Sequence, residues 1–173
     1  GVEQVKGLRG LVAWAVGSTF LIEGACAAVV YWRVRDPLES VYISIMSFCN
    51  AGLSRFTDSL AVYATDPVVL LASSFATILG GIGFLVVFNL CTFKFLRRST
   101  GTRGRLSLHT RVVLRVTGWF LLAGLAGFLL LEWHGVLANY PLPEKLYVGF
   151  FQAVTPRTCG LSVTPTEALR PVT

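Results

Sequence analysis

The stretch TPRTCGLS at residues 155–162, together with SFCNAGLS at residues 47–54, decides how this chain is interpreted. Each stretch follows an apolar region and places small and polar residues beside a glycine, close to where a membrane helix would begin. Glycine adopts backbone angles that other residues resist, so each stretch predicts a sharp turn. Two such turns in a mostly apolar chain require a structural explanation.

The composition is that of a membrane protein. Charged residues make up 14% of the 173 residues, whereas soluble domains carry about 25%. Three apolar segments, at about residues 11–32, 68–95 and 112–133, are long enough to cross a hydrocarbon core of about 30 Å as helices. Trp32 and Trp133 stand at segment ends, where aromatic rings favour the membrane interface. The predicted fold class is therefore an all-α membrane protein.

The distribution of basic residues predicts the topology. Seven of the fifteen basic residues lie within residues 94–115, with no acidic residue among them. They are Lys94, Arg97, Arg98, Arg103, Arg105, Arg111 and Arg115. A basic loop between two spans is typical of the cytoplasmic side, and this interpretation is favoured over a nucleic-acid site. Residues 33–67 and 134–173 are then expected on the outer side of the membrane.

The two outer segments are copies of one another. PLESVYISIMSFCNAGLS at residues 37–54 matches PLPEKLYVGFFQAVTPRTCGLS at residues 141–162. Both open with Pro-Leu, reach a glutamate and a tyrosine at matched spacing, and end in Gly-Leu-Ser. Each contains a short amphipathic helix that cannot span a bilayer. The repeat predicts a duplicated unit of span, short helix, glycine turn and span.

Irregular backbone at membrane depth is tolerated only where it is buried in protein or lines a water-filled cavity. A short helix and a glycine turn between two spans therefore indicate a re-entrant pore loop, whose carbonyl groups can replace the water around a cation. Glu39 and Glu144 fall near the expected starts of the two short helices, where carboxylates are favoured. The negative ends of the helix dipoles would then point toward the cavity and favour a cation.

Three motifs together resemble the Trk/Ktr/HKT superfamily of potassium transporters. They are SIMSFCNAGLSRFTDSL at 44–60, TILGGIGFLVVFNL at 77–90 and FQAVTPRTCGLS at 151–162. The resemblance covers nearly the whole chain and implies four span–pore-loop–span units around one pore. It assigns 11–95 to the second unit, with its pore helix and filter at about 38–54. It assigns 112–173 to the start of the third, with its pore helix and filter at about 143–162. Residues 1–10 become a cytoplasmic lead-in and 96–111 a basic cytoplasmic loop, in a chain expected to be a fragment.

The resemblance also implies which residues hold the ion. The selectivity-filter positions are Asn50, Ala51, Gly52, Thr158, Cys159 and Gly160. Their backbone carbonyls would bind K⁺ as the transported ion, with Na⁺ as an alternative, and no catalytic residue or bound cofactor is expected. The implied partners are the rest of the chain, a second copy in a homodimer and a cytoplasmic nucleotide-binding subunit. The expected location is the plasma (inner) membrane, where the basic loop can also face anionic lipid.

Four residues within the spans have two interpretations each. Gly80, Gly81 and Gly83 permit either close helix packing or a bend, and packing is favoured because small residues are common at membrane helix interfaces. Glu23 belongs either to an ion route or to a structural hydrogen bond near the pore helix. The structural role is favoured because buried polar groups usually have partners.

Two other functions remain open at this stage. One is a non-conducting helical scaffold or assembly subunit, whose glycine turns are ordinary loops. The other is a membrane enzyme with Cys159 as its nucleophile, although the sequence identifies no base to activate the thiol. The prediction is therefore a transporter subunit that is not an enzyme.

Overall fold

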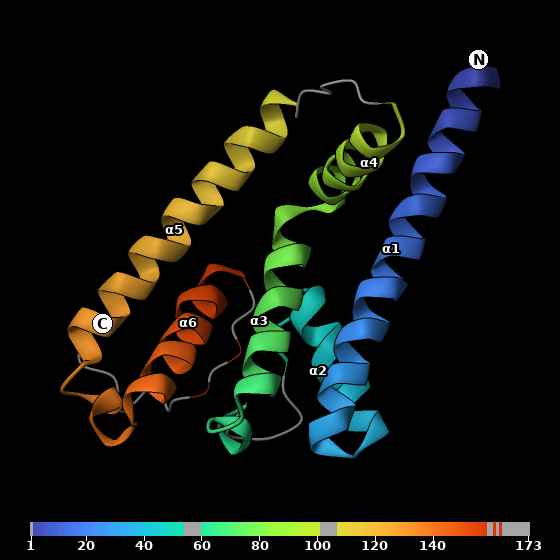
Figure 1. Ribbon diagram of the computed structural model, residues 1–173. Coiled ribbons are helices and arrows are strands. Elements are labelled where there is room, and N and C mark those ends of the chain that lie inside the picture. The colour runs from blue at the N-terminus through green and yellow to red at the C-terminus, as the bar shows by residue number, and fades with distance from the viewer. Residues whose placement is uncertain (1, 54–59, 101–106, 159–160, 162, 164–173) are drawn as a thin grey trace.

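The computed structural model describes residues 2–53, 60–100, 107–158, 161 and 163, and within these ranges the chain forms helices and no strand. The all-α prediction is thus confirmed for the described part of the chain. Figure 1 shows the helices in order from blue to red. They are α1 (Val2–Val34), α2 (Pro37–Phe48), η1 (Ala61–Tyr63), α3 (Pro67–Ile82), α4 (Phe84–Thr100), α5 (Leu108–Glu132), η2 (Val136–Asn139) and α6 (Leu142–Thr158).

Two of the predicted spans are single helices. The stretch Arg9–Val34 of α1 has 26 residues and α5 has 25, and both are apolar enough to cross a membrane. At about 1.5 Å per residue each is close to 38 Å long, which exceeds a hydrocarbon core of about 30 Å. Large apolar side chains project from both helices, such as Phe20 and Trp119, which are 71% and 74% exposed. These surfaces suit contact with lipid.

The remaining predicted span, at residues 68–95, is not one straight helix. Within residues 68–95 the chain divides into α3 and α4, whose axes differ by 95° across the break at Gly83. Gly83 has a φ of 87°, in the region that favours glycine. The expectation that packing explains all three glycines of this segment is therefore wrong for Gly83. A run of apolar residues predicts a buried or membrane-embedded segment, but it does not predict that one residue within the run adopts a left-handed backbone conformation.

Local sequence signals explain where α2 and α3 begin. Each begins at the proline of an Asp-Pro pair, Asp36-Pro37 and Asp66-Pro67, with the aspartate as its N-cap. Both aspartates accept hydrogen bonds from two free amides of the first turn of their helix. The prolines occupy a position whose amide has no partner in a helix, so the missing N–H costs nothing.

The short helices pack on both sides of α3. Helix α2 contacts α1 and α3, and α6 contacts α3 and α5. Figure 1 shows α2, α3 and α6 rising from the same end of the molecule, with α2 and α6 stopping short of the opposite end. A buried cluster joins both units, with Val30 from α1, Ile43 from α2, Leu70 from α3 and Phe151 from α6 among its members. The two short helices therefore share a single packed framework built around α3.

Candidate functional site

Helix α2 ends in a turn that the side chain of Asn50 makes possible. Asn50 has a φ of 54°. Its backbone N–H donates a hydrogen bond to the Ser47 carbonyl at 3.3 Å, and the backbone N–H of Ala51 donates to the Met46 carbonyl at 3.1 Å. This pair of bonds is the Schellman pattern of helix termination, in which glycine or asparagine takes the left-handed position. The sequence offered this signal, since asparagine is the usual second choice after glycine at such a position.

The segment that follows contains a second left-handed residue. Gly52 has a φ of 68°. Residues Asn50 to Gly52 therefore lie beyond Phe48, the last helical residue of α2. The C-terminal end of α2 also carries the negative end of the helix dipole. A cation near this turn would meet partial negative charge from the carbonyl groups at the end of α2.

Helix α3 approaches the end of α2 at Gly80. A Cβ atom added to Gly80 would lie 1.8 Å from the Phe48 carbonyl oxygen and 3.0 Å from Asn50 Nδ2. The Asn50 side chain itself donates to the Phe48 carbonyl at 3.2 Å. The lack of a side chain at Gly80 therefore lets the α3 backbone lie close to the turn, and packing remains the interpretation that the sequence favours for this residue. Gly81, the next residue, is exposed.

Glu23 lies on α1 beside the same turn. Its backbone carbonyl accepts a hydrogen bond from Ser44 Oγ at 2.6 Å. Its carboxylate Oε1 accepts from Cys49 Sγ at 3.6 Å, directly after the last residue of α2. Both contacts join α1 to the end of α2. This geometry favours the structural interpretation of Glu23 over an ion route.

The second copy of the motif differs from the first at its end. Thr158, which aligns with Asn50, is the last residue of α6 and remains helical. Threonine is β-branched and resists the left-handed region, so it does not end a helix as Asn50 does. Pro156 lies inside the same helix. The predicted filter positions Cys159 and Gly160 lie outside the described residues, as do residues 101–106 of the basic loop.

Small residues seat α6 against α5. A Cβ atom on Gly149 would lie 3.0 Å from Leu129 Cδ2, and one on Gly124 would lie 3.5 Å from Ala153 Cβ. The space at Gly149 is tight, so a glycine there lets α6 approach α5, as is common between membrane helices, whereas a Cβ atom at Gly124 would make an ordinary contact. Helix α6 therefore packs against α5 on one side and against α3 on another.

The acidic residues that the sequence places at the starts of the short helices are found there. Glu39 lies in the first turn of α2 and Glu144 in the first turn of α6. Negative charge at these ends complements the positive end of each helix dipole. The prediction for these two residues is confirmed, and it leaves the opposite, negative ends pointing into the molecule (Figure 1).

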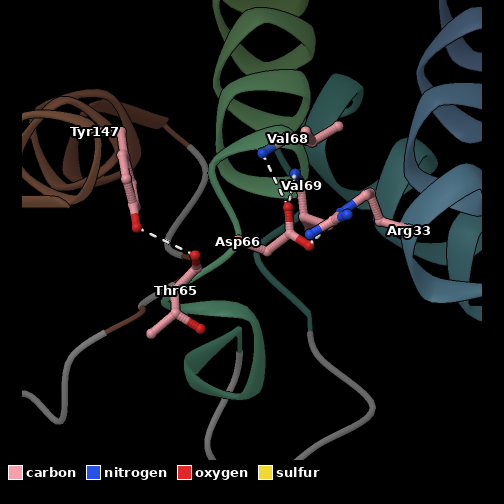
Figure 2. Close-up of polar contacts among 6 residues, drawn as sticks. All are labelled: Arg33, Thr65, Asp66, Val68, Val69 and Tyr147. Carbon is pink, nitrogen blue, oxygen red and sulfur yellow. Dashed lines mark hydrogen bonds and ion pairs between the residues drawn. The ribbon is translucent and has the colours of Figure 1, made fainter. Parts of the chain in front are cut away.

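A polar cluster joins the end of α1, the start of α3 and the first half of α6, and the sequence alone did not predict it. Figure 2 shows Arg33 of α1, the Thr65–Asp66 turn before α3, and Tyr147 of α6. Arg33 Nε lies 2.7 Å from Asp66 Oδ2, and the Tyr147 hydroxyl donates to the Thr65 carbonyl at 3.1 Å. The Asp-Pro pair signals a helix cap at Asp66. Nothing local to the sequence signals the partner at Tyr147, which lies 82 residues from Thr65.

The family described as TrkH, cation transport protein, matches residues 12–173. The Ktr system potassium uptake protein B of Bacillus subtilis is 39% identical over 127 residues, covering 71% of this chain and 26% of that protein. The potassium/sodium uptake protein NtpJ of Enterococcus hirae is 34% identical over 122 residues, covering 70% of this chain and 26% of that protein.

A third relative extends the match along the chain. The Ktr system potassium uptake protein B of Vibrio alginolyticus is 30% identical over 164 residues, covering 93% of this chain and 34% of that protein. The chain thus spans about a quarter to a third of the length of these relatives.

Proposed function

This chain belongs to the TrkH family of cation transport proteins, and from that premise we propose that it supplies two pore loops to a potassium-conducting membrane protein. The ion would lose its water shell to backbone carbonyls and pass down its electrochemical gradient. The ion-binding groups would be the carbonyls of Asn50, Ala51 and Gly52 in the first loop. Thr158, Cys159 and Gly160 would supply the matching groups in the second.

The turn after α2 is the observation that carries this proposal. A helix of 12 residues enters between two longer helices and ends in a segment with two left-handed residues, Asn50 and Gly52. Non-helical backbone at membrane depth is expected only where it is buried in protein or lines a water-filled passage. Gly80 and Glu23 hold the turn from two sides. A held turn supports selectivity, because coordinating carbonyls must keep their positions when the ion arrives.

Potassium is the proposed substrate, with sodium as the alternative. The relatives in Bacillus subtilis and Vibrio alginolyticus are named as potassium uptake proteins, and the relative in Enterococcus hirae as a potassium/sodium uptake protein. Two further pore loops, from the rest of the protein, would complete the filter. We extend the proposal to a plasma-membrane homodimer with a cytoplasmic nucleotide-binding regulator, in which the basic loop at residues 94–115 is cytoplasmic and the pore loops face outward.

Ion uptake by the full-length protein tests this proposal. In cells that lack their own potassium uptake systems, we compare wild type with Gly52→Ser and with Gly118→Ala. A side chain at Gly52 would have to adopt a φ of 68°, which costs roughly 1–2 kcal/mol. Gly118 is the control because a Cβ atom there has no neighbour within 4 Å.

We expect Gly52→Ser to lose potassium uptake or its discrimination against sodium at unchanged membrane abundance, while Gly118→Ala retains both. Uptake and selectivity equal to wild type in Gly52→Ser would mean that the turn is not part of a filter. A wild-type protein that moves neither ion would support a non-conducting scaffold instead.

A further inference from the structure

The Thr65–Asp66 turn receives contacts from two helices that lie on opposite sides of α3 (Figure 2). We infer that this turn sets the position of the second pore loop relative to the first, so that Tyr147 and Asp66 are positioning residues for cation discrimination. The inference deepens the proposed function and depends on it. It concerns residues at the outer ends of the helices, away from the candidate filter positions.

Asp66 anchors the turn to α3 and to α1 at once. Its Oδ1 accepts hydrogen bonds from the amides of Val68 at 3.0 Å and Val69 at 3.4 Å. Its Oδ2 pairs with Arg33 Nε at 2.7 Å, at the last turn of α1. The carboxylate is therefore shared between the cap of one helix and the end of another. Because the Arg33 side chain is 47% exposed, the cap contributes more to holding the turn than the ion pair does.

Tyr147 connects the same turn to α6. Its hydroxyl donates to the Thr65 carbonyl at 3.1 Å. Burial raises the pKa of Tyr147, and the nearby carboxylates of Glu144 and Asp66 raise it further. The phenol is therefore protonated at neutral pH and keeps its proton for the carbonyl. The bond joins the third unit to the second across 82 residues of sequence.

Helix α6 carries this contact toward the candidate filter. Tyr147 and Phe150 are three residues apart, so they share one face of the helix. The Phe150 ring lies 6.3 Å from the Phe75 ring of α3, which gives α6 a second contact on the same face. From Tyr147 to Thr158 the helix extends about 16 Å at 1.5 Å per residue. A shift at the Tyr147 contact would therefore move the end of α6 at Thr158, the first of the candidate filter positions in the second loop.

Helix α3 completes the connection to the first loop. Near its start lies the turn that holds Tyr147, and Gly80 near its other end touches the turn after α2. The distance between the two loops therefore depends on how α3 holds each of them. Loss of one contact should alter ion discrimination before it alters folding.

The experiment measures K⁺ and Na⁺ uptake by the full-length protein, with KM and maximal rate determined separately for each ion. Tyr147→Phe removes only the hydroxyl. We expect the ratio of the two KM values to shift about threefold to fivefold, the effect of one lost neutral hydrogen bond, at unchanged membrane abundance. Tyr31→Phe is the matched control, since Tyr31 is 45% exposed at the end of α1.

A second pair of variants tests the turn itself. Asp66→Ala removes the cap and the ion pair, and should shift the KM ratio in the same direction as Tyr147→Phe. Asp66→Asn retains a side chain that caps helices well, and should restore most of the wild-type ratio. If Tyr147→Phe reduces the amount of protein in the membrane, the contrast between the two Asp66 variants decides the question.

The possible failures are distinguishable. A wild-type protein without cation uptake overturns the proposed function. A wild-type protein that transports, with KM ratios unchanged in Tyr147→Phe and Asp66→Ala, overturns only the positioning role. A fall in maximal rate alone, with both KM values constant, would assign these residues to stability and would also refute the inference.

Discussion

Replacing Gly80 by alanine tests the close approach between α3 and the end of α2. The new Cβ atom would lie 1.8 Å from the Phe48 carbonyl oxygen, whereas real Cβ atoms essentially never come within 3.0 Å of another heavy atom. The two backbones would have to separate by about 1.2 Å, because the clashing oxygen belongs to the backbone of Phe48 and not to a flexible side chain. Asn50 follows Phe48 by two residues, so the candidate filter would move with the end of α2.

Two opposing effects decide the magnitude. Alanine is a better helix former than glycine by about 1 kcal/mol, which would stabilise α3. Overpacking costs typically 1–3 kcal/mol, and a clash between two backbones should reach the upper end of that range. We expect a net destabilisation of about 2 kcal/mol, which is roughly thirtyfold in an equilibrium constant. The sign of the change therefore reports whether the approach is as close as the structure has it.

The assay combines thermal unfolding of the detergent-solubilised full-length protein with potassium uptake in cells. Gly17→Ala is the control, because that position is helical and a Cβ atom there has no neighbour within 4 Å. Gly80→Ala should lower the midpoint of unfolding and the selectivity for potassium, while Gly17→Ala should leave both unchanged or raise the midpoint slightly. A Gly80→Ala protein as stable and as selective as wild type would refute the reasoning.

Two further substitutions test the neighbouring contacts. Gly83→Ala forces a side chain into a φ of 87° without any steric neighbour, so a strain of roughly 1–2 kcal/mol should lower the midpoint of thermal unfolding; an unchanged midpoint would contradict the bend. Cys49→Ser keeps a donor for the Glu23 carboxylate and should transport like wild type, whereas Cys49→Ala loses a bond worth about 1 kcal/mol or less. Equal potassium uptake by the two Cys49 variants would show that the contact is dispensable.

The helices of the repeated segments could be predicted from the sequence because their signals lie within a few residues of one another. Apolar length predicted α1 and α5, and the glutamates at 39 and 144 marked the first turns of the short helices. Aligning the copies indicated a turn after α2, which the left-handed angles of Asn50 and Gly52 confirm. The same alignment did not predict that Thr158 stays helical where Asn50 is left-handed. An alignment compares residue types and not the free energy that each needs to adopt a given backbone angle.

The sequence by itself determined that this is a chain of apolar helices and predicted two repeated turns, because hydrophobic length, helix caps and glycine preference act over a few residues. Only the tertiary structure decided what the turn after α2 touches. The close approach at Gly80 depends on where the end of α2 lies, whereas a Cβ atom at Gly83 would have no neighbour within 4 Å and this residue lies at the bend between α3 and α4. The contacts of Glu23 with Cys49 and of Tyr147 with Thr65 join residues 26 and 82 positions apart. Such pairs form only when packed helices bring distant segments together, and no local pattern encodes them.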